Sequence, residues 1–158
     1  MLGVFDLYTV FKFVHVFAAI IWVGGAVTTN IQGTRIRRSG DSDRLSGFGF
    51  DTEWIGTHIY LPASLIVLVF GVAAAAKAGY SFSSAWLITG IVGIVITALT
   101  GSLYLGPETK RIGALTAEKG AADPAVQERL GRLIAIARID LVVLTIVIIA
   151  MVFKPGAS

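Results

Sequence analysis

The sequence predicts an all-α fold: an integral membrane four-helix bundle of antiparallel up-down topology, with its N and C termini outside. The first observation is composition, because the 158 residues are 55% hydrophobic and 15% charged, with a mean hydropathy of +0.80. A soluble domain carries about 25% charged residues. The second is that four stretches stay apolar for the roughly 20 residues that cross a bilayer, and the third is the placement of basic residues between them. We expect one domain over residues 1–158, with spans at about residues 8–30, 54–76, 85–105 and 134–153.

The first span, residues 8–30, is expected to remain in the mature protein. Asp6 precedes it without a basic cluster, whereas arginines follow it. This order of charges is typical of an uncleaved anchor rather than of a cleaved signal peptide. The second span begins at Trp54, an aromatic residue of the kind expected at the inner interface, and it contains Pro62.

The third span, residues 85–105, has a turn before it and a proline after it. Gly79 and the serines that follow predict a tight outer turn, and Gly106-Pro107 predicts the end of the helix. Small residues recur at every fourth position, which lines them along one helical face and lets membrane helices approach closely. This face predicts packing inside the bundle, or alternatively a seam between two copies of the chain. It consists of Thr89, Gly93, Thr97 and Gly101.

The fourth span, residues 134–153, belongs to a helix that begins before the membrane. Asp123-Pro124 places a capping side chain before a proline at the first helical position, so the helix should begin in water near Ala125. Lys154-Pro155 should end it, because proline cannot continue a helix.

The basic residues predict the orientation. Residues 31–53 and 106–133 form two long polar loops with nine lysines and arginines, whereas only Lys77 and Lys154 lie on the other side. Basic residues near spans stay in the cytoplasm, so both long loops should be cytoplasmic. The net charge of +3 then reflects topology, and no nucleic-acid partner is expected. The nine residues are Arg35, Arg37, Arg38, Arg44, Lys110, Arg111, Lys119, Arg129 and Arg132.

Missing residue types narrow the chemistry. The chain has no cysteine, which excludes disulfides, iron–sulfur clusters and thiolate metal sites. It also has no nucleophile–base set, no glycine-rich phosphate loop and no HExxH spacing. The sequence therefore predicts no catalytic residue, and an enzyme is not the favoured interpretation.

His15 lies inside the first span, roughly 11 Å below the outer surface at a helical rise of about 1.5 Å per residue. An ionisable group at such a depth is a functional-site hypothesis by default. Lys12 and Trp22 share its helical face. One hypothesis is a haem b or a metal, with His15 as ligand, Lys12 facing an anionic group and Trp22 as a packing wall. The alternative is that His15 donates a hydrogen bond to a neighbouring helix while Lys12 extends to the surface.

A haem held between the two histidines of one copy is not expected. His58 enters from the opposite side and lies roughly 6 Å from the inner surface. In a core about 30 Å thick, more than about 10 Å then separates the two residues along the membrane normal. Two axial nitrogens on one iron lie only about 4 Å apart. Whether His15 and His58 meet across a subunit interface stays open.

A second polar cluster is expected in the inner leaflet around Asp140, which lies about 9 Å deep. Arg138 is two residues away and points to a different face, so Asp140 needs a partner from another helix. The cluster is either a polar clamp between helices or a relay for protons or ions. Its predicted members are His58, Tyr104, Arg138 and Asp140, with Thr28, Thr29, Asn30 and Ser102 at the same level.

Five segments resemble, in order and spacing, a bacterial integral membrane family catalogued as domain of unknown function 2269. The resemblance covers nearly the whole chain and implies a multi-pass protein of the bacterial cytoplasmic (inner) membrane, but it implies no established activity. The segments are residues 15–25, 53–56, 62–65, 105–108 and 151–155.

The pattern His-x-x-Ala-Ala-x-x-Trp-x-Gly-Gly of residues 15–25 is also similar to the first helix of two further families. These are the copper-resistance D-type membrane domains and the membrane protoporphyrinogen oxidases that bind haem b. The similarity implies copper or haem chemistry at His15. However, the chain lacks the methionine-rich path of a copper importer, since its methionines are Met1 and Met151.

Three functions stay open at this point. The first is a haem- or metal-binding bundle for membrane redox chemistry or metal homeostasis. The second is an oligomeric proton- or ion-coupled transporter or channel that uses the inner-leaflet cluster. The third is a scaffold or accessory subunit without chemistry of its own. The expected partners are the lipid bilayer and, as a homo-oligomer, further copies of the chain.

Overall fold

The computed structural model describes residues 6–155, and all regular secondary structure in that part of the chain is helical. Within these residues, four helices are long and apolar enough to cross a membrane: Leu7–Ser39, Ser42–Lys77, Ala85–Lys119 and Pro124–Phe153. The predicted all-α fold with four spanning helices is confirmed. Two of the four contain a π-helical turn. In chain order the elements are α1 (Leu7–Ser39), α2 (Ser42–Ile55), the π-helix η2 (Gly56–Tyr60), α3 (Leu61–Lys77), α4 (Ala85–Thr100), the π-helix η3 (Gly101–Leu105), α5 (Gly106–Lys119) and α6 (Pro124–Phe153).

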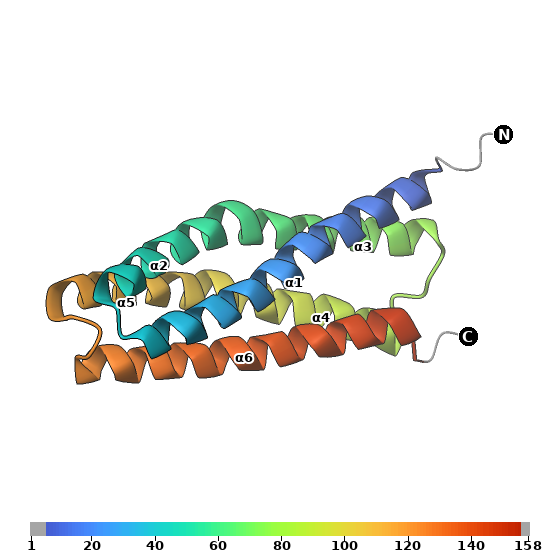
Figure 1. The fold of residues 1–158 in the computed structure, drawn as a ribbon. Helices are drawn as coiled ribbons and strands as arrows, with labels where there is room; N and C mark the ends of the chain where they lie inside the picture. Colours follow the sequence, from blue (N-terminus) through green and yellow to red (C-terminus); the bar gives the residue numbers. More distant parts are fainter. Residues whose placement is uncertain (1–5, 156–158) are drawn as a thin grey trace.

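The long helices alternate in direction, as the up-down topology requires (Figure 1). α1 packs along α3 and α6, α4 packs along α6, and α2 packs along α5. Both ends of the described chain lie at one end of the bundle, together with the connection from α3 to α4 (Figure 1). We call this the termini end. The opposite end carries the turns from α1 to α2 and from α5 to α6, and we call it the basic end.

The two long segments predicted as polar loops, residues 31–53 and 106–133, are mainly helical, and this corrects the sequence-based prediction. α1 runs on to Ser39, and α2 begins directly after Asp41, whose side chain accepts a hydrogen bond from the Arg44 amide at 3.1 Å. The helices continue because the basic end has an apolar core of its own. This core consists of Leu45, Ile112, Ala121, Val126, Leu130, Leu133 and Ile134.

The predicted helix end at Gly106-Pro107 is wrong, because the helix passes through it. The Gly106 amide donates to the Gly101 carbonyl five residues back, which makes a π-helical turn immediately before Pro107. Proline has no amide hydrogen and clashes with the turn before it in a regular α-helix. A π-turn loosens that ladder and lets the chain continue. A second π-helical turn precedes Pro62, where the Leu61 amide donates to the Gly56 carbonyl.

The predicted limits of the last helix are confirmed. The Ala125 amide donates to the Asp123 carboxylate at 2.8 Å, and α6 starts at Pro124. It ends at Phe153, where Lys154 takes the left-handed conformation with φ of 44°. The predicted turn at Gly79 is also present, with φ of 74°.

The outer faces of the helices are apolar over the spans. Large hydrophobic side chains point away from the bundle on α1, α3, α4 and α6, among them Phe13, Ile20, Val69, Val92 and Val152. Water does not tolerate so large a contiguous apolar surface. These faces are suited to lipid, which supports the interpretation of the helices as membrane spans.

Candidate functional site

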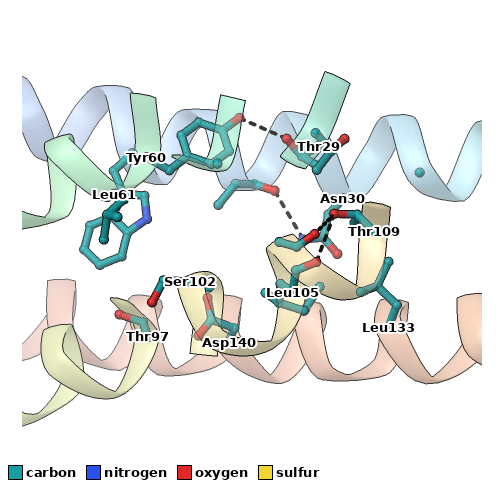
Figure 2. Close-up of a pocket in the computed structure, with 18 of the residues that line it drawn as sticks. Thr29, Asn30, Tyr60, Leu61, Thr97, Ser102, Leu105, Thr109, Leu133 and Asp140 are labelled. Atoms are coloured by element: carbon teal, nitrogen blue, oxygen red, sulfur yellow. Dashed lines mark hydrogen bonds between the residues drawn. The ribbon is translucent and has the colours of Figure 1, made fainter. Parts of the chain in front are cut away.

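A cavity of about 120 Å³ lies between the four long helices, in the half of the bundle nearer the basic end. All four of them, including both π-helices, contribute side chains to it. It reaches from Trp22, inside the first span, to Leu130, which precedes the fourth span. Figure 2 shows this cavity and part of its polar lining. The polar residues in the lining are Thr29, Asn30, Thr52, Tyr60, Ser64, Thr97, Ser102, Thr109 and Asp140.

The two π-helices position part of this lining. Gly56, which begins η2, and Gly101, which begins η3, both line the cavity. Tyr60 at the end of η2 points to α1, where its hydroxyl hydrogen-bonds the Thr29 hydroxyl at 3.0 Å (Figure 2). Tyr60 also packs on Gly25, where a Cβ atom would collide with the phenol ring. A π-turn re-aims the side chains that follow it and is frequent at functional sites.

Most hydroxyl groups in the lining already donate their hydrogen to a backbone carbonyl of the same helix. Thr97 donates to the Gly93 carbonyl at 3.0 Å, and Ser102 donates to the Ala98 carbonyl at 2.8 Å. Ser64 and Thr109 likewise donate to carbonyls of their own helices. A hydroxyl that donates in this way keeps its oxygen lone pairs as acceptors. The lining therefore presents mainly acceptors to whatever occupies the cavity.

Asp140 of α6 is the one acidic residue among the described residues that line the cavity, and no lysine, arginine or histidine lines it. Asp140 is half-buried, and its side chain points into the cavity on the side of Ser102 and Thr97 (Figure 2). Within residues 6–155, no group donates a hydrogen bond to its carboxylate or forms an ion pair with it. A buried ionised carboxylate without a partner is costly. The group must therefore carry a proton or be balanced by a cation or a donor in the cavity.

Phe48 of α2 closes the cavity toward a second space. That second space is a groove between the end of α1 and the start of α2, and Phe48 is the residue that lines both. The ring packs against Gly33 of α1, where a Cβ atom would lie 3.3 Å from the Phe48 Cζ atom. The cavity and the groove thus share this aromatic ring as a wall.

The inner-leaflet residues predicted from the sequence fall into two groups. Asp140 lines the cavity together with Thr29, Asn30 and Ser102. The other predicted members do not line it. His58 is exposed, stacks on Trp54 with ring centroids 4.6 Å apart and donates to the Trp54 carbonyl at 2.9 Å. Arg138 is exposed and Tyr104 is half-buried.

The four residues of the predicted small-residue face of α4 also differ in their surroundings. Gly93 faces α6, since a Cβ atom there would collide with Val147, and Thr97 is buried beside it. Gly101 opens η3 and lines the cavity. Thr89 is half-buried.

His15 is half-buried and joins α1 to α3. Its Nδ1 atom donates to the Val67 carbonyl at 2.8 Å. The imidazole lies on Gly71, where a Cβ atom would come within 2.7 Å of Nδ1. Lys12 is exposed, and its ammonium lies 5.8 Å from the ring centroid of Tyr8.

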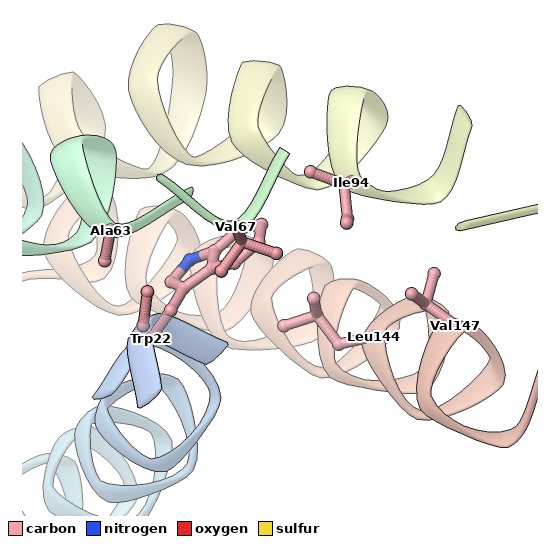
Figure 3. Packing of buried hydrophobic residues seen from close by; sticks show 7 residues of the cluster. Trp22, Ala63, Val67, Ile94, Leu144 and Val147 are labelled. Atoms are coloured by element: carbon pink, nitrogen blue, oxygen red, sulfur yellow. The ribbon is translucent and has the colours of Figure 1, made fainter. Parts of the chain in front are cut away.

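Trp22, the predicted packing wall beside His15, belongs to the hydrophobic core. Trp22 is buried in one core cluster with Val67 of α3 (Figure 3). The other buried members are Ala18, Ala63, Ile94, Leu144 and Val147. No group of three or more His, Cys, Asp or Glu side chains within residues 6–155 is arranged to hold a metal ion. Trp22 belongs to the same core cluster as Val67, whose carbonyl accepts the hydrogen bond from His15, while Lys12 is exposed.

Several cavity residues had no signal in the sequence analysis. Tyr60, Ser64, Thr52 and Thr109 are single polar residues in helical segments, where spacing alone does not identify an inward face. A signal for the π-helices was present, however. Gly56 precedes Pro62 at the same spacing at which Gly101 precedes Pro107, and each pair brackets a π-turn.

One ion pair lies beside the cavity at the basic end. The Glu108 carboxylate is 8% exposed and accepts a hydrogen bond from Arg129 at 2.7 Å, with Arg111 at 3.7 Å. This hydrogen bond raises the pKa of the Arg129 guanidinium. The pair fastens α5 to α6.

The comparisons with known proteins agree with this architecture. A family model described as "Predicted integral membrane protein (DUF2269)" matches residues 9–155. No curated protein matches the chain. No solved structure matches it either.

Proposed function

Because the chain belongs to this family of predicted integral membrane proteins, we propose that its cavity is a membrane-embedded site that binds a proton or a small cation at Asp140. Binding at this site would couple to the passage of an ion or small solute across the membrane. The other cavity residues supply neutral oxygen acceptors around the carboxylate.

One observation carries this proposal: Asp140 lines an internal cavity in which no positively charged side chain accompanies it. A charged side chain at the centre of a membrane helix costs about 2.5–3.5 kcal/mol. Ionisable residues kept at that cost in membrane proteins mark proton relays and ion pathways. A structural clamp would instead show a donor at the carboxylate, and the described residues offer none.

The size of the cavity limits which ligands it can hold. A buried water needs about 10–15 Å³ of such space, so the cavity of about 120 Å³ holds several waters or a partly hydrated cation. Pockets for drug-sized molecules measure about 300–1,000 Å³. The cavity therefore suits a proton with its water chain, a monovalent cation or a small amine, rather than a large cofactor.

The orientation and assembly form part of the same proposal. The basic end carries the arginines that predict a cytoplasmic location, and Asp140 lies on that side of the membrane. Four spans are few for a transporter, so we include a homo-oligomer in the bacterial inner membrane.

Carbodiimide labelling tests the proposal, because a carbodiimide modifies protonated carboxyl groups in apolar surroundings. The purified full-length chain in detergent is labelled across a pH series and with added sodium or potassium, and the modified residue is identified by peptide mass spectrometry. We expect labelling of Asp140 that falls as pH rises or as the cation is added. Asp43→Asn, which removes an exposed carboxylate of α2, should label as the parent does.

Ion flux gives the second measurement. Proteoliposomes with an internal pH- or cation-sensitive dye should show a flux that Asp140→Asn abolishes and Asp43→Asn retains. If Asp140 labels equally at every pH and with every cation, and if the Asn variant leaves the flux unchanged, the proposal is wrong.

The geometry favours the cavity over His15 as the functional site. His15 already has a hydrogen-bond partner, whereas within residues 6–155 the Asp140 carboxylate has neither a hydrogen-bond donor nor an ion-pair partner. Absorption spectra of the purified chain, oxidised and reduced, with and without added haemin, test this order of preference. A Soret band that disappears in His15→Ala would reverse it.

A further inference from the structure

The groove at the basic end is a separate space with its own chemistry. It has a volume of about 680 Å³ and lies between the last turns of α1 and the first turns of α2. Gly40, with φ of 67°, reverses the chain between the two helices. α2 then leans on α5, because Gly49 and Gly113 let these two helices touch through their backbones. The groove remains on the side of α2 that faces away from α5 and toward α1.

The groove carries two arginines without a partner in the described chain. Arg35 comes from α1 and Arg44 from α2, and both are exposed. Within residues 6–155, the ion pairs of the basic end use Arg111, Arg129 and Arg132 instead. Asp51 lies in the same groove and is the one acidic residue among those that line it. The groove thus has a net positive charge and a set of unused guanidinium donors.

The depth of the groove places it beside lipid headgroups. On α1, Ile31 is an exposed apolar residue of the span, and Arg35 follows it after about 6 Å of helix. On α2, Asp51 precedes the exposed Trp54 by about 4.5 Å. The headgroup region of each leaflet occupies about 5–8 Å beyond the hydrocarbon. Arg35 and Asp51 therefore lie within that layer. Arg44 is ten residues before Trp54, about 15 Å along α2, so the groove opens from the headgroup layer toward water.

We propose that this groove binds the phosphate group of an anionic phospholipid between Arg35 and Arg44. Guanidinium groups suit phosphate oxygens because they donate in a planar fork. Basic pockets between membrane helices bind acidic headgroups in the same way. The exposed apolar faces of α1 and α2 at Ile31 and Phe50 lie next to the groove and suit the acyl chains. The source of the phosphate is the bilayer, and the proposal is independent of the function proposed for Asp140.

Competitive lipid binding tests this proposal. The detergent-purified full-length chain is equilibrated with equal amounts of phosphatidylglycerol and phosphatidylcholine, and native mass spectrometry gives the ratio of the two bound lipids. We expect phosphatidylglycerol to be preferred. Arg35→Gln and Arg44→Gln should each lower the preference about fivefold, which corresponds to the contribution of one basic residue at a membrane surface.

Two further variants keep the test decisive. Arg38→Gln removes the same charge from an exposed arginine of α1 that does not line the groove, and it should change the preference by less than twofold. Asp51→Asn removes the carboxylate that opposes the phosphate and should raise the preference severalfold. A gain of this kind cannot result from misfolding. Equal losses in Arg35→Gln and Arg38→Gln, or no gain in Asp51→Asn, would overturn the proposal.

A soluble competitor distinguishes the lipid from a free anion. Inorganic phosphate and glycerol phosphate are added at millimolar concentration to the chain with bound phosphatidylglycerol. We expect the lipid to remain bound. Displacement by either anion would assign the groove to a soluble phosphate compound and contradict the lipid assignment.

Discussion

At the scale of single residues, Gly71 explains the place of His15. Gly71 of α3 has no side chain, which leaves the space that the imidazole of His15 occupies. The ring then reaches the carbonyl of Val67, which is also on α3. Small residues let a neighbouring helix or side chain approach closely in membranes. The hydrogen bond that results joins α1 to α3 near the termini end.

Gly71→Ala should therefore destabilise the protein by about 1–3 kcal/mol, because the new methyl group displaces the ring and costs the hydrogen bond. Thermal unfolding in detergent measures this effect. His15→Ala frees the same space, so Gly71→Ala should cost much less in the His15→Ala background. Equal costs in both backgrounds would show that the ring and the glycine do not interact.

At the scale of elements, the contact of α2 with α5 shows why the basic end is folded. A Cβ atom on Gly49 would lie 2.6 Å from the Thr109 carbonyl oxygen and 2.8 Å from the Gly113 Cα atom. The two backbones meet at this point, and Ser46 donates to the Gly113 carbonyl at 3.0 Å. This contact holds the helices together beyond the apolar spans.

Gly49→Ala should separate α2 from α5 and lower the stability by about 1–3 kcal/mol. Gly47→Ala is the matched control on the same helix, since a Cβ atom at Gly47 would meet no other atom within 4 Å. It should leave the stability unchanged or raise it by up to about 1 kcal/mol, because alanine favours helix over glycine. Proteolysis of the basic end and thermal unfolding together measure both variants, and the reverse order of stability would contradict the contact.

The elements also show what sequence reasoning could and could not predict. The spans follow from hydropathy, and the start of α6 follows from Asp123-Pro124, because both signals are local. The continuation of the third helix through Pro107 was missed, because proline after glycine usually ends a helix and the repeated Gly–Pro spacing identifies a π-turn only once the structure is known. The inward position of Asp140 depends on how α6 is rotated against three other helices. Depth along a span can be counted from the sequence, but the face that a residue presents cannot.

At the scale of the whole molecule, the orientation in the membrane remains a prediction from charge. The chain contains no cysteine, so a single introduced cysteine reports its location directly. Ser83→Cys lies in the exposed turn between α3 and α4, and Ser39→Cys lies at the end of α1.

In intact cells, a membrane-impermeant maleimide should label Ser83→Cys and leave Ser39→Cys unlabelled until the membrane is opened. Both sites are exposed, so each serves as the control for the reactivity of the other. Labelling of Ser39→Cys in intact cells would invert the topology and place Asp140 nearer the outside.

The whole molecule has one further property, which follows from the position of Phe48. Its ring borders the compartment around Asp140 on one side and the crevice of Arg35 and Arg44 on the other. A rotation of that ring which enlarges one compartment must reshape the other. A substitution of Phe48 therefore alters the walls of both spaces, whereas a substitution of any other lining residue alters the wall of one.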